Sequence, residues 1–282
     1  APATGLHNAT YLAALEHLDN SIGRLTGAVD DLGLRERTLV VFLTDNGGVY
    51  QIYNMQPFTA GPGTDTQLTV ATEEFSTAPL RAGKGSQYEG GIRVPCLVRW
   101  PGVIAPGRVE ATPIHVIDWA ATFLDLAGGR PPAGHPLDGA SLAPLFRGGS
   151  LPERPLFWYT PFYELRWGVT PSAIIRDGDW KLIDYFGDSF DERLRYRAGA
   201  RVELFHLHDD PGESRDLAAR EPARARALQE KLRAWIRATG AVIPGPNPHH
   251  DPSRPLKETR AKPPHVARSE ERRVGKECRS RW

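Results

Sequence analysis

The chain has few of the residues that would assign it to a specialised class of protein. Its two cysteines, Cys96 and Cys278, are too few for a disulfide framework, and they neither indicate nor exclude an oxidising compartment. No run of 18 apolar residues occurs, so the sequence predicts no membrane span. The formal net charge is only +1, which gives no general attraction to nucleic acid or to an anionic membrane. The 282 residues are enough for one large core with a smaller satellite domain.

The sequence also lacks an initiator methionine and a signal peptide. It begins Ala1-Pro2-Ala3-Thr4 and passes directly into a predicted helix. We therefore expect a fragment of a longer protein, and the missing signal says nothing about where that protein is located.

The first half of the chain has the pattern of an α/β body. Apolar residues from Tyr11 to Leu32 recur in steps of four and three, which predicts a helix of about six turns that ends at Gly33. The apolar run 38–44 shows no alternation, so we expect a strand buried on both faces, as in a parallel sheet. Residues 94–100 predict a second strand and 114–127 a further helix. The polar stretch 47–91 between the strands is predicted to be a long loop, and loops of this length are usually either functional or disordered.

The second half of the chain has a different pattern of predicted elements. Short strands are predicted at 156–159, 172–176, 180–185 and 202–207, followed by a helix at 222–239, which together indicate a small antiparallel sheet with one helix. We therefore expect a division into residues 1–150, 151–248 and a tail at 249–282. The charged tail is predicted to be disordered or foreign to the fold; a basic nucleic-acid-binding tail is the less favoured alternative, because charge runs are usually solvated.

Two segments carry candidate chemistry. Asp45-Asn46-Gly47-Gly48 directly follows the first predicted strand, and a carboxylate beside an amide oxygen suits a hard cation. Gly83-Lys84-Gly85 can bring a compact ammonium close to an oxyanion, although the spacing is not that of a P-loop. Each segment alone has an ordinary alternative, a plain turn in the first case and a solvated glycine loop in the second. We also expect an ion pair between Glu89 and Arg93 to hold the second segment.

Taken in order, these segments resemble the sulfatase family, and the resemblance extends from about residue 8 to 250. The residues that carry it are Leu18 to Arg24, Thr44 to Gly47, Gly83 to Pro95, Arg99 to Gly102, Val116 to Asp118, Leu137 to Leu142, Asp179 to Ile183, Glu203 to Phe205 and Asp210 to Glu213. The resemblance implies part of an alkaline-phosphatase-like sheet between helices, with the antiparallel subdomain at its C-terminal side. It implies calcium-dependent hydrolysis of a sulfate monoester, on a sulfated small molecule or a sulfated glycan. It leans towards a periplasmic or secreted protein.

The resemblance also assigns roles to individual residues. Asp45 and Asn46 would ligate one Ca²⁺, and Lys84 would contact the sulfate group as a catalytic and substrate-binding residue. The family's nucleophile is a formylglycine made within a C-x-[PA]-x-R motif, which is missing here: Cys96 is followed by Leu97-Val98-Arg99, and neither Cys278 nor Ser172 fits. With only half of the oxygen ligands, we expect the chain alone to bind calcium weakly and to be inactive.

Two other readings stay open. One is a phosphodiesterase or phosphonate-monoester hydrolase of the same alkaline-phosphatase-like superfamily, which would differ in nucleophile and metals. The other is a non-catalytic binding or scaffold protein in which Asp45-Asn46 is only a turn. The substrate is not specified by the sequence, although the insertion from Gln51 to Phe75 is expected at the rim of a pocket.

Overall fold

A computed structural model describes residues 9–54, 69–73, 76–164, 169–191, 196–245 and 248. The side chains of 51–54 and 69–73 are not described, so the expected pocket rim at Gln51–Phe75 lies largely outside the described residues, as does the tail 249–282. No described helix is both long and apolar enough to cross a membrane.

The long N-terminal helix is confirmed. Helix α1 (Ala9–Asp31) is followed by Gly33 in a left-handed conformation (φ +69°), which favours glycine, and by the short 3₁₀ helix η1 (Arg35–Arg37). Its C-terminal end is attached to the neighbouring strand, because Asp30 accepts two hydrogen bonds from Arg99 at 2.6 and 2.8 Å. The apolar stripe of α1 stays accessible: none of its residues is buried, and Leu25 is 59% exposed.

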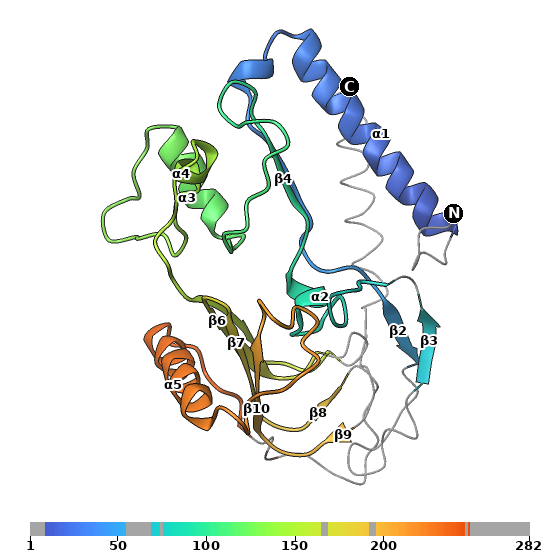
Figure 1. Cartoon of the computed structure of the whole chain (residues 1–282), viewed down its shortest axis with the longest axis vertical. Helices are drawn as coiled ribbons and strands as arrows, with labels where there is room; N and C mark the ends of the chain where they lie inside the picture. The colour runs from blue at the N-terminus through green and yellow to red at the C-terminus, as the bar shows by residue number, and fades with distance from the viewer. Residues whose placement is uncertain are drawn as a thin grey trace.

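Two strands form the centre of the first half. Strands β1 (Val40–Leu43) and β4 (Cys96–Arg99) pair antiparallel, with Val41 opposite Val98 and Phe42 opposite Leu97. Figure 1 shows this pair between α1 on one side and the helices α3 (Asp118–Leu126) and α4 (Ala143–Phe146) on the other. Within the described residues these helices therefore flank a sheet, as expected.

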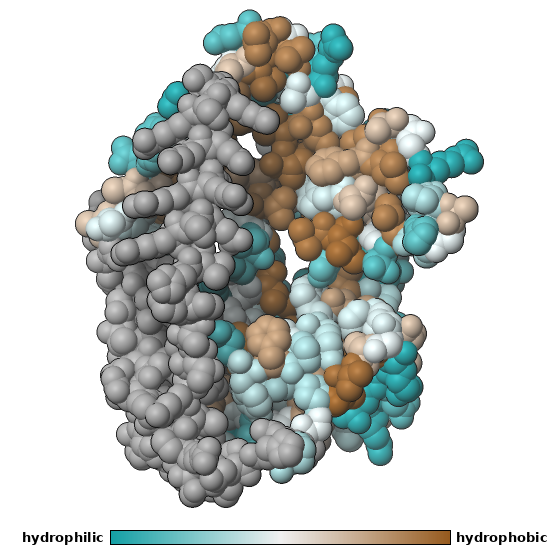
Figure 2. Space-filling view, turned by 180° about the vertical axis from the view of Figure 1, so that it is seen from behind, coloured by the Kyte–Doolittle hydropathy of each residue, from teal (hydrophilic) through white to brown (hydrophobic). Residues whose placement is uncertain are grey.

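The expectation of a parallel strand buried on both faces was wrong. Because side chains alternate along a strand, Val41, Leu43 and Val98 point to one side and pack on a core of Trp119, Leu142, Leu145 and Phe146. On the opposite face Leu97 is 61% exposed. In Figure 2 apolar residues gather over the upper part of the molecule, where these strands and the helices α3 and α4 lie. The run 38–44 thus has the composition of a buried strand, but one face has little cover among the described residues.

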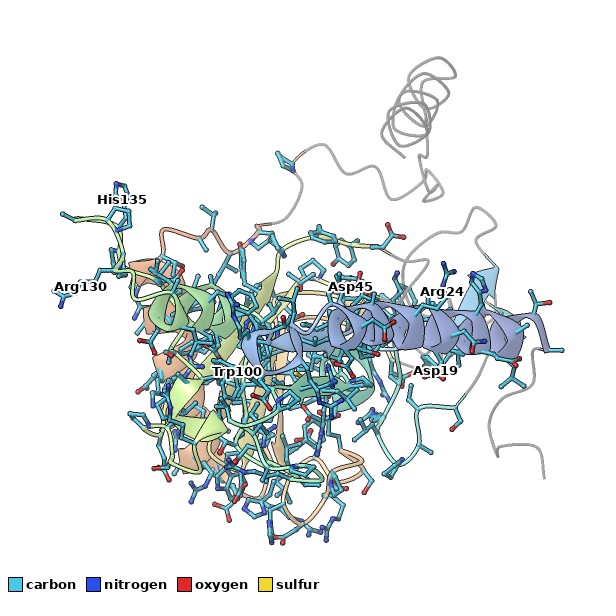
Figure 3. The ribbon with its side chains drawn as sticks, turned by 90° about the horizontal axis from the view of Figure 1, so that it is seen from above. Asp19, Arg24, Asp45, Trp100, Arg130 and His135 are labelled. Carbon is cyan, nitrogen blue, oxygen red and sulfur yellow. The ribbon has the colours of Figure 1, made fainter. Side chains whose placement is uncertain are left out.

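The stretch predicted as one long loop contains short elements. Strands β2 (Gln51–Asn54) and β3 (Thr69–Glu73) form an antiparallel pair, and the one-turn helix α2 (Glu89–Ile92) precedes β4. The predicted helix at 114–127 begins later, at Asp118. This buried carboxylate accepts hydrogen bonds from the amides of His115 and Ala140, and so joins the start of α3 to the segment before α4. The loop after α3 carries the exposed Arg130 and His135, far from Asp45 (Figure 3).

The C-terminal half contains the best-buried core. Strands β5 (Leu156–Thr160), β6 (Ser172–Asp177), β7 (Trp180–Tyr185) and β10 (Arg201–His206) form an antiparallel sheet in the order β10-β7-β6-β5. Strands β8 (Ser189–Phe190) and β9 (Tyr196–Arg197) form a separate short pair. Helix α5 (Pro222–Ala238) covers one face through Leu228, Leu232 and Ile236. The predicted antiparallel sheet and helix are confirmed, whereas the domain boundary at residue 150 stays a prediction.

Candidate functional site

The end of β1 presents oxygen atoms. We call residues 44–48 the strand tip. Asp45 is exposed and Asn46 is half-buried, and the Asn46 side-chain amide donates from Nδ2 to the Gly47 carbonyl at 2.7 Å. Because the amide nitrogen is used in this way, Oδ1 of Asn46 is the atom left to face a cation. The Thr44 hydroxyl beside them is buried and has no hydrogen-bond partner within the described residues.

The segment that contains Lys84 lies directly against the strand tip. We call residues 79–93 the Lys84 loop. The Lys84 amide donates to the Gly48 carbonyl at 2.8 Å, and the Gly47 amide donates to the Gly91 carbonyl, also at 2.8 Å. The structure therefore brings the backbones at Asp45-Asn46 and Lys84 together at one end of the β1–β4 pair, with Lys84 itself half-buried.

Glycine is required where these two segments meet. A Cβ added to Gly47 would lie 1.8 Å from the Gly90 carbonyl oxygen, and one added to Gly83 would lie 2.4 Å from the Gly48 oxygen. At Gly90 an added Cβ would meet the carbonyl oxygens of Ala82 and Arg81 at 2.2 and 2.4 Å. All of these obstacles are backbone atoms, which cannot turn aside as a side chain can. The contact is thus a close approach of two backbones.

The other side of the Lys84 loop is anchored on the C-terminal sheet. Lys181 on β7 is completely buried, and its Nζ lies 3.0 Å from Oε1 of Glu89 and 2.7 Å from Oε1 of Glu213. We call Lys181, Glu89 and Glu213 the buried ion cluster. Close by, the Tyr88 hydroxyl donates to Glu203 on β10 at 2.7 Å, and the Arg81 guanidinium lies 3.7 Å from the centre of the Tyr88 ring.

The expected ion pair between Glu89 and Arg93 was wrong. Helix α2 ends at Ile92 and Arg93 is extended, so the two residues do not share a helix face, and Arg93 is exposed. No local pattern predicts the true partners, Lys181 and Glu213, because they are 92 and 124 residues away from Glu89. Their only signal was their presence within segments already singled out as family-like, at 179–183 and 210–213.

Burial changes the protonation of several groups around this anchor. It raises the pKa of the Glu213 carboxyl above its ordinary value of 4.5, against the opposing effect of the nearby Lys181 ammonium. It also raises the pKa values of the Tyr88 and Tyr185 hydroxyls, which therefore stay protonated across the physiological range and act as hydrogen-bond donors.

The donor set at the strand tip fits part of a calcium shell. Asp45 and Asn46 supply two oxygen ligands, while Ca²⁺ takes six to eight. Among the described residues, no group of three His, Cys, Asp or Glu side chains is arranged to hold a metal ion. Calcium and the roles of Asp45, Asn46 and Lys84 therefore stay predictions.

The formylglycine motif has no counterpart within the described residues. Cys96 lies on β4, opposite Leu43 in the register, and the residue as a whole is exposed. Its sulfur is nevertheless partly buried, which raises the pKa of the thiol and disfavours the reactive thiolate. Ser172 is buried on β6, where its hydroxyl donates to the Thr170 carbonyl. Cys278 lies outside the described residues. Neither Cys96 nor Ser172 stands in a C-x-[PA]-x-R motif.

Comparisons with known proteins agree on one family. A family model described as "Sulfatase" matches residues 7–129, and one described as "N-sulphoglucosamine sulphohydrolase, C-terminal" matches residues 83–239. The chain is similar to the steryl-sulfatase of Mus musculus, with 35% identity over 263 residues that cover 86% of this chain and 39% of that protein. The chain spans about two fifths of the length of the first curated relatives that it matches.

Solved structures give the same fold. The crystal structure of Ps i-CgsB in complex with k-i-k-neocarrahexaose matches with a TM-score of 0.57 and 25% identity, over 77% of this chain and 40% of that chain. The phosphonate monoester hydrolase of Agrobacterium radiobacter matches with a TM-score of 0.53 and 23% identity, over 79% and 40%, which shows a likeness of fold alone. The expected alkaline-phosphatase-like fold is confirmed. The second family model covers more than half of the chain, and the two models together extend from residue 7 to 239, so the chain belongs to the sulfatase family.

Proposed function

We propose that this chain forms part of a sulfuric ester hydrolase, in which Asp45 and Asn46 ligate one Ca²⁺ and Lys84 contacts the sulfate group of the substrate. The observation that carries the proposal is the pair of backbone hydrogen bonds that joins the strand tip to the Lys84 loop. They keep the main chain at the candidate cation ligands next to the main chain at the candidate ammonium. A sulfated small molecule or a sulfated glycan is the proposed substrate class.

The residues present would act on a sulfate ester by binding and orientation. The Lys84 ammonium would attract the non-bridging sulfuryl oxygens and donate hydrogen bonds to them. The adjacent glycines carry no side chain that would keep the substrate at a distance. A bound Ca²⁺ would add positive charge that stabilises the negative charge developing on the same oxygens. No described residue is assigned as the nucleophile.

Ligand binding tests the proposal separately from turnover. In the full chain, titration with inorganic sulfate should shift the NMR signals of the Lys84 side chain and of the Gly83 and Gly85 amides, and Lys84→Met should abolish these shifts. The matched control is Lys231→Met, which removes a lysine on α5 from an exposed pair with Asp177. Sulfate shifts that persist in the Lys84 variant would contradict the assignment.

The proposed calcium site is also tested by ligand binding. Asp45→Asn should weaken the binding of Ca²⁺ measured by calorimetry, because a carboxylate ligand loses its charge. We expect the 282-residue chain to bind Ca²⁺ more weakly than micromolar and to release no 4-nitrophenol from 4-nitrophenyl sulfate. Micromolar or tighter binding, or measurable turnover, would contradict the expectation that further ligands and the nucleophile lie elsewhere.

The phosphonate-monoester alternative has one specific observation in its favour, the likeness of fold to a phosphonate monoester hydrolase. Competition between sulfate and methylphosphonate for Lys84 distinguishes a sulfatase from a phosphonate monoester hydrolase. Methylphosphonate should displace sulfate from Lys84 only at much higher concentration if the site is adapted to sulfate. A reversed order of affinity would favour the alternative.

A further inference from the structure

Lys181 is buried in a way that is unusual for a lysine. Its side chain has no exposed surface, and a buried ammonium is stable only with close anionic partners. The partners are the carboxylates of Glu89 and Glu213 at 3.0 and 2.7 Å. Because one lysine faces two carboxylates, its removal would leave two buried acidic groups with little compensation. The Arg176 guanidinium is farther away, 3.8 Å from Oε2 of Glu89.

The two carboxylates connect Lys181 to the Lys84 loop through the backbone. Oε2 of Glu213 accepts a hydrogen bond of 2.5 Å from the Glu89 amide, at the first residue of α2. The Glu213 carbonyl accepts from the Arg81 side chain at 2.7 Å, near the start of the same loop. Glu213 itself has a positive φ of +50°, which is rare for a residue other than glycine and is maintained by the surrounding contacts. Both ends of the loop are therefore held by one glutamate.

The chain from Glu89 to the strand tip is short. Glu89 begins α2, and two residues later the Gly91 carbonyl accepts the hydrogen bond from the Gly47 amide. Gly90, between them, packs directly on the Arg81 and Ala82 carbonyls. A displacement of Glu89 would thus move the backbone that contacts the residue next to Asn46.

We propose that Lys181, through Glu89 and Glu213, is a positioning residue that fixes the Lys84 loop against the Asp45-Asn46 tip; this inference rests on the proposed function of Lys84. The ion pairs of Lys181 are with Glu89 and Glu213, and it would act on the strand tip through them. Because Lys181 belongs to the C-terminal sheet, the position of the Lys84 loop, and with it the geometry of the site, depends on that sheet. The three family-like segments at 83–95, 179–183 and 210–213 meet at this one cluster.

Hydrogen exchange on the full chain tests the proposal. Lys181→Met should accelerate exchange of the Gly47 and Lys84 amides, which bridge the tip and the loop, by about tenfold or more relative to the Ile175 amide within the β5–β6–β7 ladder. Lys231→Met is the matched control: its pair with Asp177 is equally short at 2.7 Å but exposed, and the ratio should not change. Acceleration of all amides by the same factor would mean that Lys181 contributes only stability, and would overturn the proposal.

A second variant covers the case in which Lys181→Met does not fold. Glu213→Gln keeps the Lys181–Glu89 pair but weakens the bond to the Glu89 amide, and it should give the same selective acceleration on a smaller scale. An unchanged ratio there would overturn the proposal. If sulfate does not bind at Lys84 in the wild-type chain, the proposed function fails, whereas the exchange ratio still decides whether Lys181 positions the loop.

Discussion

Gly47→Ala should separate the strand tip from the Lys84 loop. The new methyl group would begin 1.8 Å from the Gly90 carbonyl oxygen and 2.9 Å from the Gly91 Cα. The two backbones would have to move apart by about 1.5 Å to reach van der Waals contact. A shift of this size breaks the hydrogen bond from the Gly47 amide to the Gly91 carbonyl and strains that from Lys84 to Gly48. With overpacking costing about 1–3 kcal/mol and a lost buried hydrogen bond about 1–3 kcal/mol, we expect a loss of about 2–5 kcal/mol in unfolding free energy.

Urea unfolding followed by tryptophan fluorescence measures this loss. Gly27→Ala is the matched control, since Gly27 lies within α1 and an added Cβ meets nothing within 4 Å. That control should be neutral or stabilising by up to about 1 kcal/mol, because alanine favours the helix. A Gly47→Ala variant within about 0.5 kcal/mol of the wild type would refute the close backbone approach on which the site depends.

Two further stability predictions follow from burial. Because burial raises the pKa of Glu213 in the folded state, its contribution to stability is complete below the ordinary value of 4.5 and is lost as the pH rises through the raised value. Glu213→Gln should therefore gain stability relative to the wild type as the pH is raised from 4.5 to 7.5 in urea unfolding, and a difference independent of pH would contradict the assignment. Leu232→Ala removes a completely buried side chain of α5 and should cost about 2–5 kcal/mol, against less than about 0.5 kcal/mol for the exposed Leu25→Ala; equal effects would mean that α5 does not cover the sheet.

The elements that could be predicted are those whose pattern is local. The stripe from Tyr11 to Leu32 and Gly33 after it predicted α1. The short strand candidates separated by turns, with the Leu228 and Leu232 stripe, predicted the C-terminal sheet and α5. Strand pairing was less accessible. The run 38–44 predicted a strand correctly, but its antiparallel partner and its open face depend on what packs against it, which composition does not encode.

The candidate site residues could be predicted from the sequence, whereas the buried residues that hold them in place could not. Asp45, Asn46 and Lys84 were found from short motifs, and the structure brings their backbones together through Gly47, Gly48 and Gly91. Their chemical roles stay predictions. The buried ion cluster was missed, because Lys181 on β7 has no sequence pattern that relates it to two glutamates that lie 92 residues before it and 32 residues after it.

The glycine-mediated contact also limits how the site can be altered. Gly47 and Gly83 each meet the opposing segment through a backbone oxygen, so any larger residue at either position would force the two main chains apart. The distance between the two main chains is thus set by the main-chain path. A change in the distance between the strand tip and the Lys84 loop would therefore require inserting or deleting residues in the segments that connect them.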